Sequence, residues 1–127
     1  MKDIAVKVGI MPYEKFKEYT MAIACGKHKP KQNEPKIWFG SIETMSQVLS
    51  TRNLELLKLI EEKKPQSMKE LADLSGRKIS NLSRTLKTFS RYGIVDLIER
   101  NRNKIPVAKA TSFEIEYGKK YPAFSIQ

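Results

Sequence analysis

The sequence has few of the cysteines, histidines and long apolar runs that secreted, metal-binding and membrane proteins need. Its 127 residues include one cysteine and one histidine, and aromatic residues make up only 9%. A single cysteine cannot form an intramolecular disulfide, so nothing indicates a secreted, disulfide-stapled scaffold. No uncharged apolar run approaches the roughly 20 residues of a membrane span. We therefore expect one globular domain of a size that can bury a core without disulfides or metals.

Enzymatic and cofactor chemistry also finds little support. The sequence contains no glycine-rich phosphate loop and no carboxylate cluster that would hold magnesium. Cys25 and His28 supply two ligands, whereas structural zinc takes four, so we interpret them as a helix-end cysteine and a linker histidine. Trp38 and Phe39 are interpreted as core or dimer contacts. We predict neither catalysis nor a cofactor.

The stretch from Ala22 to Cys25 is similar to the cleavage box of a lipoprotein signal. The residues before it include Glu14, Lys15 and Lys17, whereas a signal peptide needs an unbroken apolar region there. This argues against a signal peptide and predicts a cytoplasmic protein.

Negative charge is also scarce, and this points to a polyanionic partner. Lysine and arginine number 24 against 14 acidic residues, which gives a net charge of +10. A small protein this basic usually meets nucleic acid, and less often an acidic membrane or protein. Residues 77–109 hold nine basic residues and two acidic ones. We expect the partner surface in that region.

The first forty residues predict a small arm. Residues 3–10 alternate between apolar and polar, as in a strand, and Pro12 opens a helical pattern that ends at Gly26. Residues 27–36 form a polar linker, and residues 37–39 read as a second strand. Such short strands seek an edge to pair with, in the same chain or in another, so the arm is the expected source of dimer contacts.

From Ser41 the pattern is mainly helical. Ser41 and Thr51 are placed to cap two helices, the second ending at Lys64 and Pro65. Residues 67–70 match a capping box, in which serine and glutamate side chains satisfy each other's backbone amides, and that helix stops at Gly76.

Separate sequence signals predict the last helix and the strands that follow it. A helix is predicted from Ile79 to Tyr92, with Gly93 as its left-handed stop. Strands are predicted at 94–98, 105–109 and 113–117, with a polar turn at 99–104.

The helix predicted at 79–92 has two contrasting faces. At about 100° per residue, Leu82, Leu86 and Phe89 share one face. The opposite face consists of basic and small polar residues without an acid. These are the side chains that read base edges or contact phosphates in a major groove. A solvated surface is the alternative, but such faces usually mix charge signs, so we favour DNA contact. The residues of the turn at 99–104 could be polar only because a hairpin turn is exposed to solvent, but we favour contact with DNA phosphates.

The stretches at 68–72, 79–87 and 92–95 resemble the core pattern of bacterial and archaeal winged-helix regulators of the MarR and ArsR type. This resemblance, which covers roughly residues 51–117, implies a three-helix core with a β-wing, homodimers and palindromic operators. It places Ser80, Asn81, Ser83, Arg84 and Lys87 on the recognition helix. The chain lacks the long terminal helices of MarR proteins and the cysteine or histidine clusters of metal-sensing ArsR proteins. Its arm is similar to that of small winged-helix antitoxins.

The sequence therefore predicts an α+β fold: a strand–helix–strand arm (1–40), a winged helix-turn-helix domain (41–117) and a C-terminal tail (118–127). The predicted function is sequence-specific binding of double-stranded DNA as a transcriptional regulator, a dimeric repressor. One alternative is an antitoxin that captures a cognate toxin through its arm and represses its own operon. Another is a winged helix that contacts only protein or RNA. The predicted DNA-binding residues are Lys69, Arg77, Lys78, Ser80, Asn81, Ser83, Arg84, Lys87, Thr88, Arg91, Arg100, Arg102 and Lys104.

Overall fold

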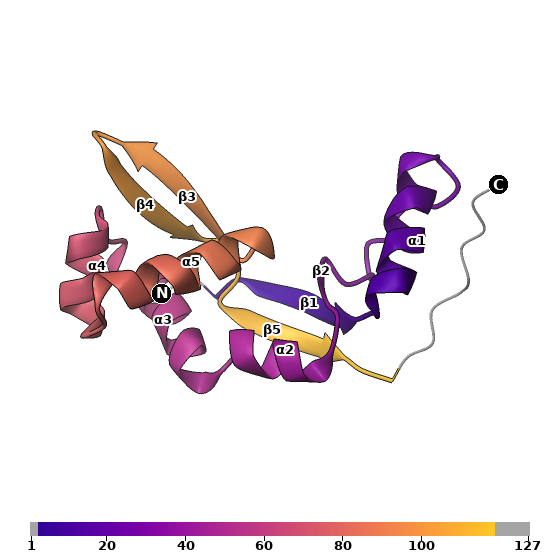
Figure 1. Ribbon diagram of the computed structural model, residues 1–127, viewed down its shortest axis with the longest axis horizontal. Coiled ribbons are helices and arrows are strands. Elements are labelled where there is room, and N and C mark those ends of the chain that lie inside the picture. Colours follow the sequence, from indigo (N-terminus) through magenta and orange to yellow (C-terminus); the bar gives the residue numbers. More distant parts are fainter. Residues whose placement is uncertain (1–2, 119–127) are drawn as a thin grey trace.

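The computed structural model describes residues 3–118 as an α+β fold (Figure 1). Its elements in chain order are β1 (Ala5–Ile10), α1 (Tyr13–Ala24), β2 (Ile37–Phe39), α2 (Ile42–Val48), α3 (Thr51–Lys63), α4 (Met68–Ser75), α5 (Ile79–Arg91), β3 (Val95–Arg100), β4 (Asn103–Ala108) and β5 (Ser112–Glu116). No helix between residues 3 and 118 is long and apolar enough to cross a membrane. The predicted tail, apart from Gly118, lies outside the described residues.

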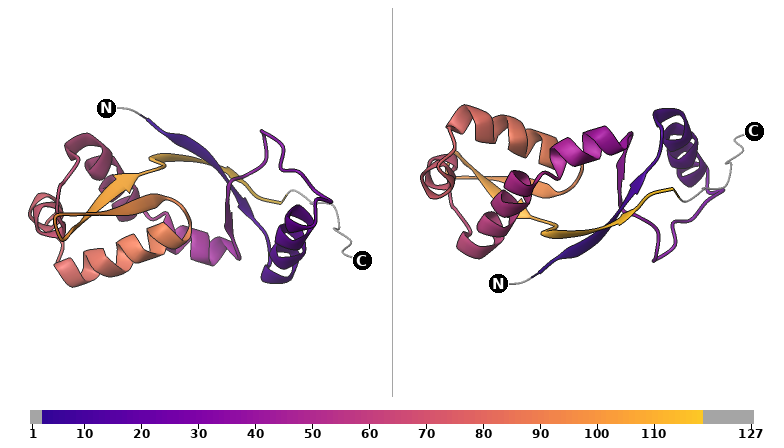
Figure 2. Two further views of the ribbon diagram at one scale, coloured as in Figure 1. Left: turned by 90° about the horizontal axis from the view of Figure 1, so that it is seen from above. Right: turned by 90° about the horizontal axis from the view of Figure 1, so that it is seen from below.

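The strands of the arm pair within the chain, in a parallel sheet of order β2-β1-β5. β1, α1 and β2 correspond to the predicted strand–helix–strand arm, and the two strands pair in parallel as a β-α-β unit in which Val8 lies beside Ile37. On the other side of β1, Val8 lies beside Ile115 of β5. The predicted arm thus shares its sheet with a strand from the opposite end of the sequence, as the views in Figure 2 show.

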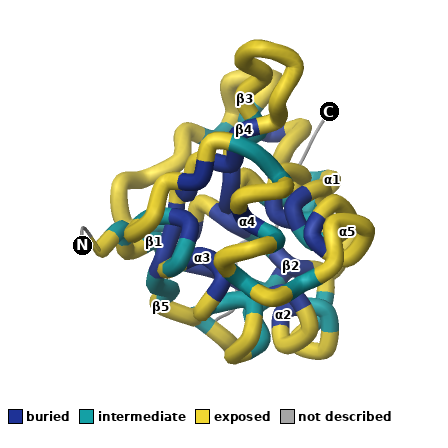
Figure 3. The backbone as a smooth tube through the Cα atoms, turned by 90° about the vertical axis from the view of Figure 1, so that its left-hand side faces the viewer, coloured by how far each residue is buried: buried dark blue, intermediate teal, exposed yellow. Residues whose placement is uncertain are grey.

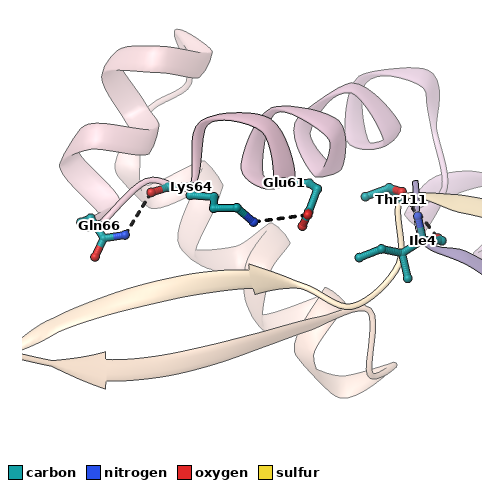
Figure 4. Close-up of polar contacts among 5 residues, drawn as sticks. All are labelled: Ile4, Glu61, Lys64, Gln66 and Thr111. Atoms are coloured by element: carbon teal, nitrogen blue, oxygen red, sulfur yellow. Dashed lines mark hydrogen bonds and ion pairs between the residues drawn. The ribbon is translucent and has the colours of Figure 1, made fainter. Parts of the chain in front are cut away.

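A buried threonine fixes the start of the β1–β5 pairing. Thr111 is 1% exposed, and its Oγ1 accepts a hydrogen bond of 2.8 Å from the backbone amide of Ile4 (Figure 4). The backbone amide of Thr111 in turn donates to the carbonyl oxygen of Ile4 at 2.8 Å. The hydroxyl also donates to Asp3 Oδ1 at 3.0 Å, so this buried polar group is fully satisfied.

A close approach of backbone and indole explains the glycine in β1. A Cβ atom at Gly9 would overlap the ring of Trp38 and press on Pro35. The indole in turn packs against Tyr19 of α1, with ring centroids 5.4 Å apart. Gly9 therefore allows α1 and the linker to close over this face of the sheet.

Serine side chains cap three of the helices. Ser41 Oγ accepts from the amide of Thr44 at 3.2 Å, as predicted for α2. The predicted cap Thr51 is wrong: Ser50 Oγ accepts from the amide of Asn53 at 3.3 Å, and Thr51 is the first helical residue. The hydroxyls of Ser50 and Thr51 offer the same chemistry, so the sequence did not distinguish them.

The capping box of α4 forms in part. Ser67 Oγ accepts from the amide of Glu70 at 3.0 Å, as predicted. The carboxylate of Glu70 accepts from the amide of Gln66 at 3.0 Å, one residue earlier than the reciprocal bond of a capping box requires. Gly76 ends α4 with a φ of 74°, as predicted.

The arm and the helices share one hydrophobic core (Figure 3, dark blue). Val8 and Phe39 of the sheet are fully buried in the same cluster as Leu57, Leu82 and Ile94. The Phe39 ring also packs against Tyr92, with centroids 4.5 Å apart. The predicted domain boundary after residue 40 stays a prediction.

Candidate nucleic-acid interface

The helix α5 buries one face and exposes the other, as predicted. Leu82, Leu86 and Phe89 are at most 1% exposed, and they anchor the helix in the core. Gly93 ends the helix with a φ of 76°, and the amide of Ile94 donates to the carbonyl oxygen of Phe89 at 2.9 Å. This pattern is a Schellman cap, and it leads the chain directly into β3.

The outward face of α5, opposite Leu82, carries positive and polar side chains; Ile79, the first residue of the helix, is also 50% exposed. The exposed residues predicted for this face are Ser80, Asn81, Ser83, Arg84, Lys87 and Arg91. Thr88 is half-buried, and its hydroxyl donates to the carbonyl oxygen of Arg84 at 3.1 Å. Within residues 3–118 neither Arg84 nor Lys87 forms an ion pair with an acidic group. Their charges are therefore available to a polyanion.

The β3–β4 hairpin presents the second group of predicted residues. Its turn is shorter than the predicted 99–104: only Asn101 and Arg102 separate the strands, with φ values of 51° and 66°. Positive φ at both central residues is the geometry of a type I′ turn, which matches the twist of the flanking strands. Arg100, Arg102 and Lys104 are all exposed.

Lys69 and Lys78 lie at the starts of two consecutive helices. Lys69 is an exposed residue in the first turn of α4. Lys78 is the exposed N-cap residue of α5, and its side chain makes no capping hydrogen bond. Both ammonium groups therefore remain solvent-exposed on the helices that precede or form the basic face.

Arg77 has an internal role that distinguishes it from the other predicted residues. Its Nη1 donates to Asn53 Oδ1 at 3.2 Å, and its Nη2 donates to the carbonyl oxygen of Arg52 at 2.8 Å. Burial lowers the pKa of this guanidinium, and the neighbouring charge of Arg52 lowers it further, against a smaller effect of Glu55. The arginine thus ties the turn between α4 and α5 to the start of α3.

The structure also brings Gln47 to this surface, although no motif in the sequence selects this residue. Gln47, near the end of α2, lines a cleft with Arg84 and Thr88 of α5. Asn53 lines the same cleft, and its Nδ2 donates to the carbonyl oxygen of Val48 at 3.0 Å. Because this meeting depends on tertiary packing, no local pattern marks it. On α5 itself, exposed Ser90 lies on the flank of the helix, where it lines a second cleft with Lys87, Arg91 and Leu97.

The single histidine lies far from this surface in the sequence and has its own partners. His28 Nε2 lies 3.0 Å from Glu34 Oε1, and Tyr19 donates to Glu34 Oε2 at 2.7 Å. Burial alone would raise the pKa of Glu34, but the hydrogen bonds with Tyr19 and His28 outweigh it and lower the pKa. Cys25 is an exposed free thiol. Between residues 3 and 118 no three histidine, cysteine or acidic side chains gather in a way that would hold a metal ion.

Comparison with known proteins identifies a family. The HVO_A0114 family model matches residues 48–115, which include α3, α4, α5 and the hairpin, and the chain belongs to this family. No curated protein and no solved structure gives a significant match.

Proposed function

We propose that this protein is a sequence-specific double-stranded DNA-binding regulator of the winged helix-turn-helix type. In this proposal α5 enters the major groove and the β3–β4 hairpin acts as the wing against the DNA backbone. Lysine and arginine charges supply affinity through the phosphates, and the polar side chains of α5 read base edges.

The observation that carries the proposal is the composition of the exposed face of α5. This face opposes three buried apolar residues, carries arginine and lysine without acidic neighbours on the helix, and adds asparagine and serine between them. An ordinary solvated helix face would mix charge signs at a spacing of three or four residues. The connection of α4 to α5 by a short glycine-containing turn, and of α5 to a hairpin with a basic tip, supports the same function.

Duplex DNA is a better candidate than single-stranded nucleic acid. Recognition of single strands depends on aromatic side chains on which bases stack. The large exposed aromatic residues between 3 and 118 are Tyr13 and Tyr117. Tyr13 opens α1, which lies at the opposite end of the molecule from α5 in Figure 1, and Tyr117 follows β5. The exposed basic face lacks such a platform.

The test is fluorescence anisotropy with labelled duplexes from a randomised pool, before and after selection, at several salt concentrations. About six to ten phosphate contacts would reduce affinity on the order of 10³- to 10⁵-fold between 50 and 200 mM salt. Arg84→Gln should weaken binding, whereas Lys17→Gln, the same loss of charge on exposed α1, should not. A flat salt response, or equal loss in both variants, would refute the proposal. The predicted homodimer and the possible toxin partner stay predictions.

A further inference from the structure

A groove of about 240 Å³ separates the C-terminal end of α3 from the β3–β4 hairpin. Figure 4 shows Glu61 and Lys64 on the side of α3 that faces the hairpin. The groove lies on the part of the hairpin away from α5: the cleft beside α5 contacts Leu97, whereas this groove is lined by Ile98 and its cross-strand partner Ile105. It is therefore separate from the basic face of α5.

The walls of the groove are mainly aliphatic. Ile60 of α3 and Ile105 of β4 are buried along it, with 1% and 8% of their surfaces exposed. Ile98 and Val107 on the hairpin line the same groove but remain 43% and 37% exposed. Aliphatic side chains that meet in a concave surface and still contact water favour an apolar ligand.

The charges at the groove leave one positive group without a partner. Lys64 Nζ lies 3.3 Å from Glu61 Oε1, so these two side chains compensate each other. Arg100 also lines the groove, is exposed, and forms neither a hydrogen bond nor an ion pair through its side chain with any residue from 3 to 118. A guanidinium offers a planar fork of donors that matches a carboxylate.

We propose that this groove binds a medium-chain aliphatic carboxylate. The alkyl chain lies against Ile60, Ile98 and Val107, and the carboxylate receives hydrogen bonds from Arg100. Branched aliphatic walls and the volume of the groove suit a flexible chain. An amine of the same length would meet the positive charge of Arg100, and an alcohol would lose the charge-assisted hydrogen bond.

Occupancy of the groove has a consequence that rests on the proposed function. Arg100 is also one of the predicted DNA contacts, so a bound carboxylate would compete with a DNA phosphate for the same guanidinium. The ligand would then weaken DNA binding. Binding of the carboxylate itself does not depend on the proposed function.

The experiment titrates the full chain with octanoate, octanol and octylamine, followed by amide chemical shifts and calorimetry. Octanoate should saturate in about the millimolar range that suits a ligand of this size, and it should shift the amides of Ile98 and Val107. Arg100→Gln should weaken octanoate about two- to fivefold, because it removes an ion pair at an exposed side chain, and leave octanol unchanged. Arg102→Gln is the matched control, because it removes the same charge from the hairpin tip outside the groove, and it should bind octanoate as the native protein does.

Several results would overturn the proposal. Octylamine binding as tightly as octanoate, equal losses in the two arginine variants, or no saturable binding would each refute a carboxylate site. Shifts at Ile98 and Val107 that follow protein concentration instead of octanoate would show a contact between copies of the chain. The two proposals can also fail separately: a protein that binds octanoate but no duplex retains the groove site and loses the DNA-binding function, and the reverse result removes only the groove site.

Discussion

Replacing Arg77 by glutamine should cost stability without removing a phosphate contact. The guanidinium makes two hydrogen bonds, of 3.2 Å to Asn53 Oδ1 and 2.8 Å to the carbonyl oxygen of Arg52. Hydrogen bonds from a charged donor contribute about 1.5–3 kcal/mol each when buried. Because Arg77 is only half-buried, solvent screening reduces this, and we expect the free energy of unfolding to fall by about 1–3 kcal/mol in total.

Urea denaturation measures the stability, and DNA affinity against salt measures the contact. Each phosphate contact contributes about 0.9 to the slope of the logarithm of affinity against the logarithm of salt concentration. Arg77→Gln should lower affinity by a similar factor at every salt concentration, since the start of α5 loses its tie to α3, and should leave the slope unchanged.

Lys78→Gln is the matched control, because Lys78 is the next residue, exposed, and free of any capping hydrogen bond. It should keep the native stability and lower the slope by about 0.9. The reasoning is refuted if Arg77→Gln keeps full stability and lowers the slope by that amount, since Arg77 would then contact a phosphate as the sequence predicted.

Three further predictions concern base readout, the sheet and the arm. In competition binding, Asn81→Ala and Arg84→Ala should each relax discrimination between related DNA sites by about 1–3 kcal/mol, whereas Lys104→Ala should weaken binding to all sites alike. Identical behaviour of the helix and hairpin variants would contradict the assignment of base readout to α5 and phosphate contact to the hairpin. Gly9→Ala should lower the free energy of unfolding by about 1–3 kcal/mol through overlap with Trp38, whereas Gly40→Ala, which meets no atom within 4 Å, should have little effect in thermal denaturation. Because the pKa of Glu34 is lowered from 4.5, its carboxylate stabilises the fold above that pH, and this stabilisation is lost as the pH falls through the lowered value. The stability difference between native protein and Glu34→Gln should therefore shrink on acidification, and a difference that grows would show the opposite sign.

Local patterns predicted much of the helical region. The spacing of Leu82, Leu86 and Phe89 determined which face of α5 is buried, because a helix repeats every 3.6 residues whatever lies around it. Ser67 and Gly93 were recognised as helix ends because their roles depend on neighbours within a few residues.

Features that depend on distant residues could not be predicted in this way. Arg77 contacts Asn53, 24 residues earlier, so its charge alone suggested a DNA contact. No periodicity shows that β5 pairs with β1, since an alternating strand fits any edge of matching polarity. The two-residue hairpin turn was missed because Arg102, unlike glycine, gives no signal for a positive φ.

The pairing of Ile4 with Thr111 has a consequence for how the protein is made. The two residues are 107 positions apart, yet they define where the first and last strands of the sheet meet. A ribosome adds about 5–20 residues each second, so β1 is synthesised about 5–20 s before β5. During that time β1 can pair only with β2. The edge of β1 that later pairs with β5 stays unpaired and is available to other nascent chains. Slow translation of the last part of the mRNA would prolong this exposure. The yield of folded protein in the cell should then fall, even though the finished protein is unchanged.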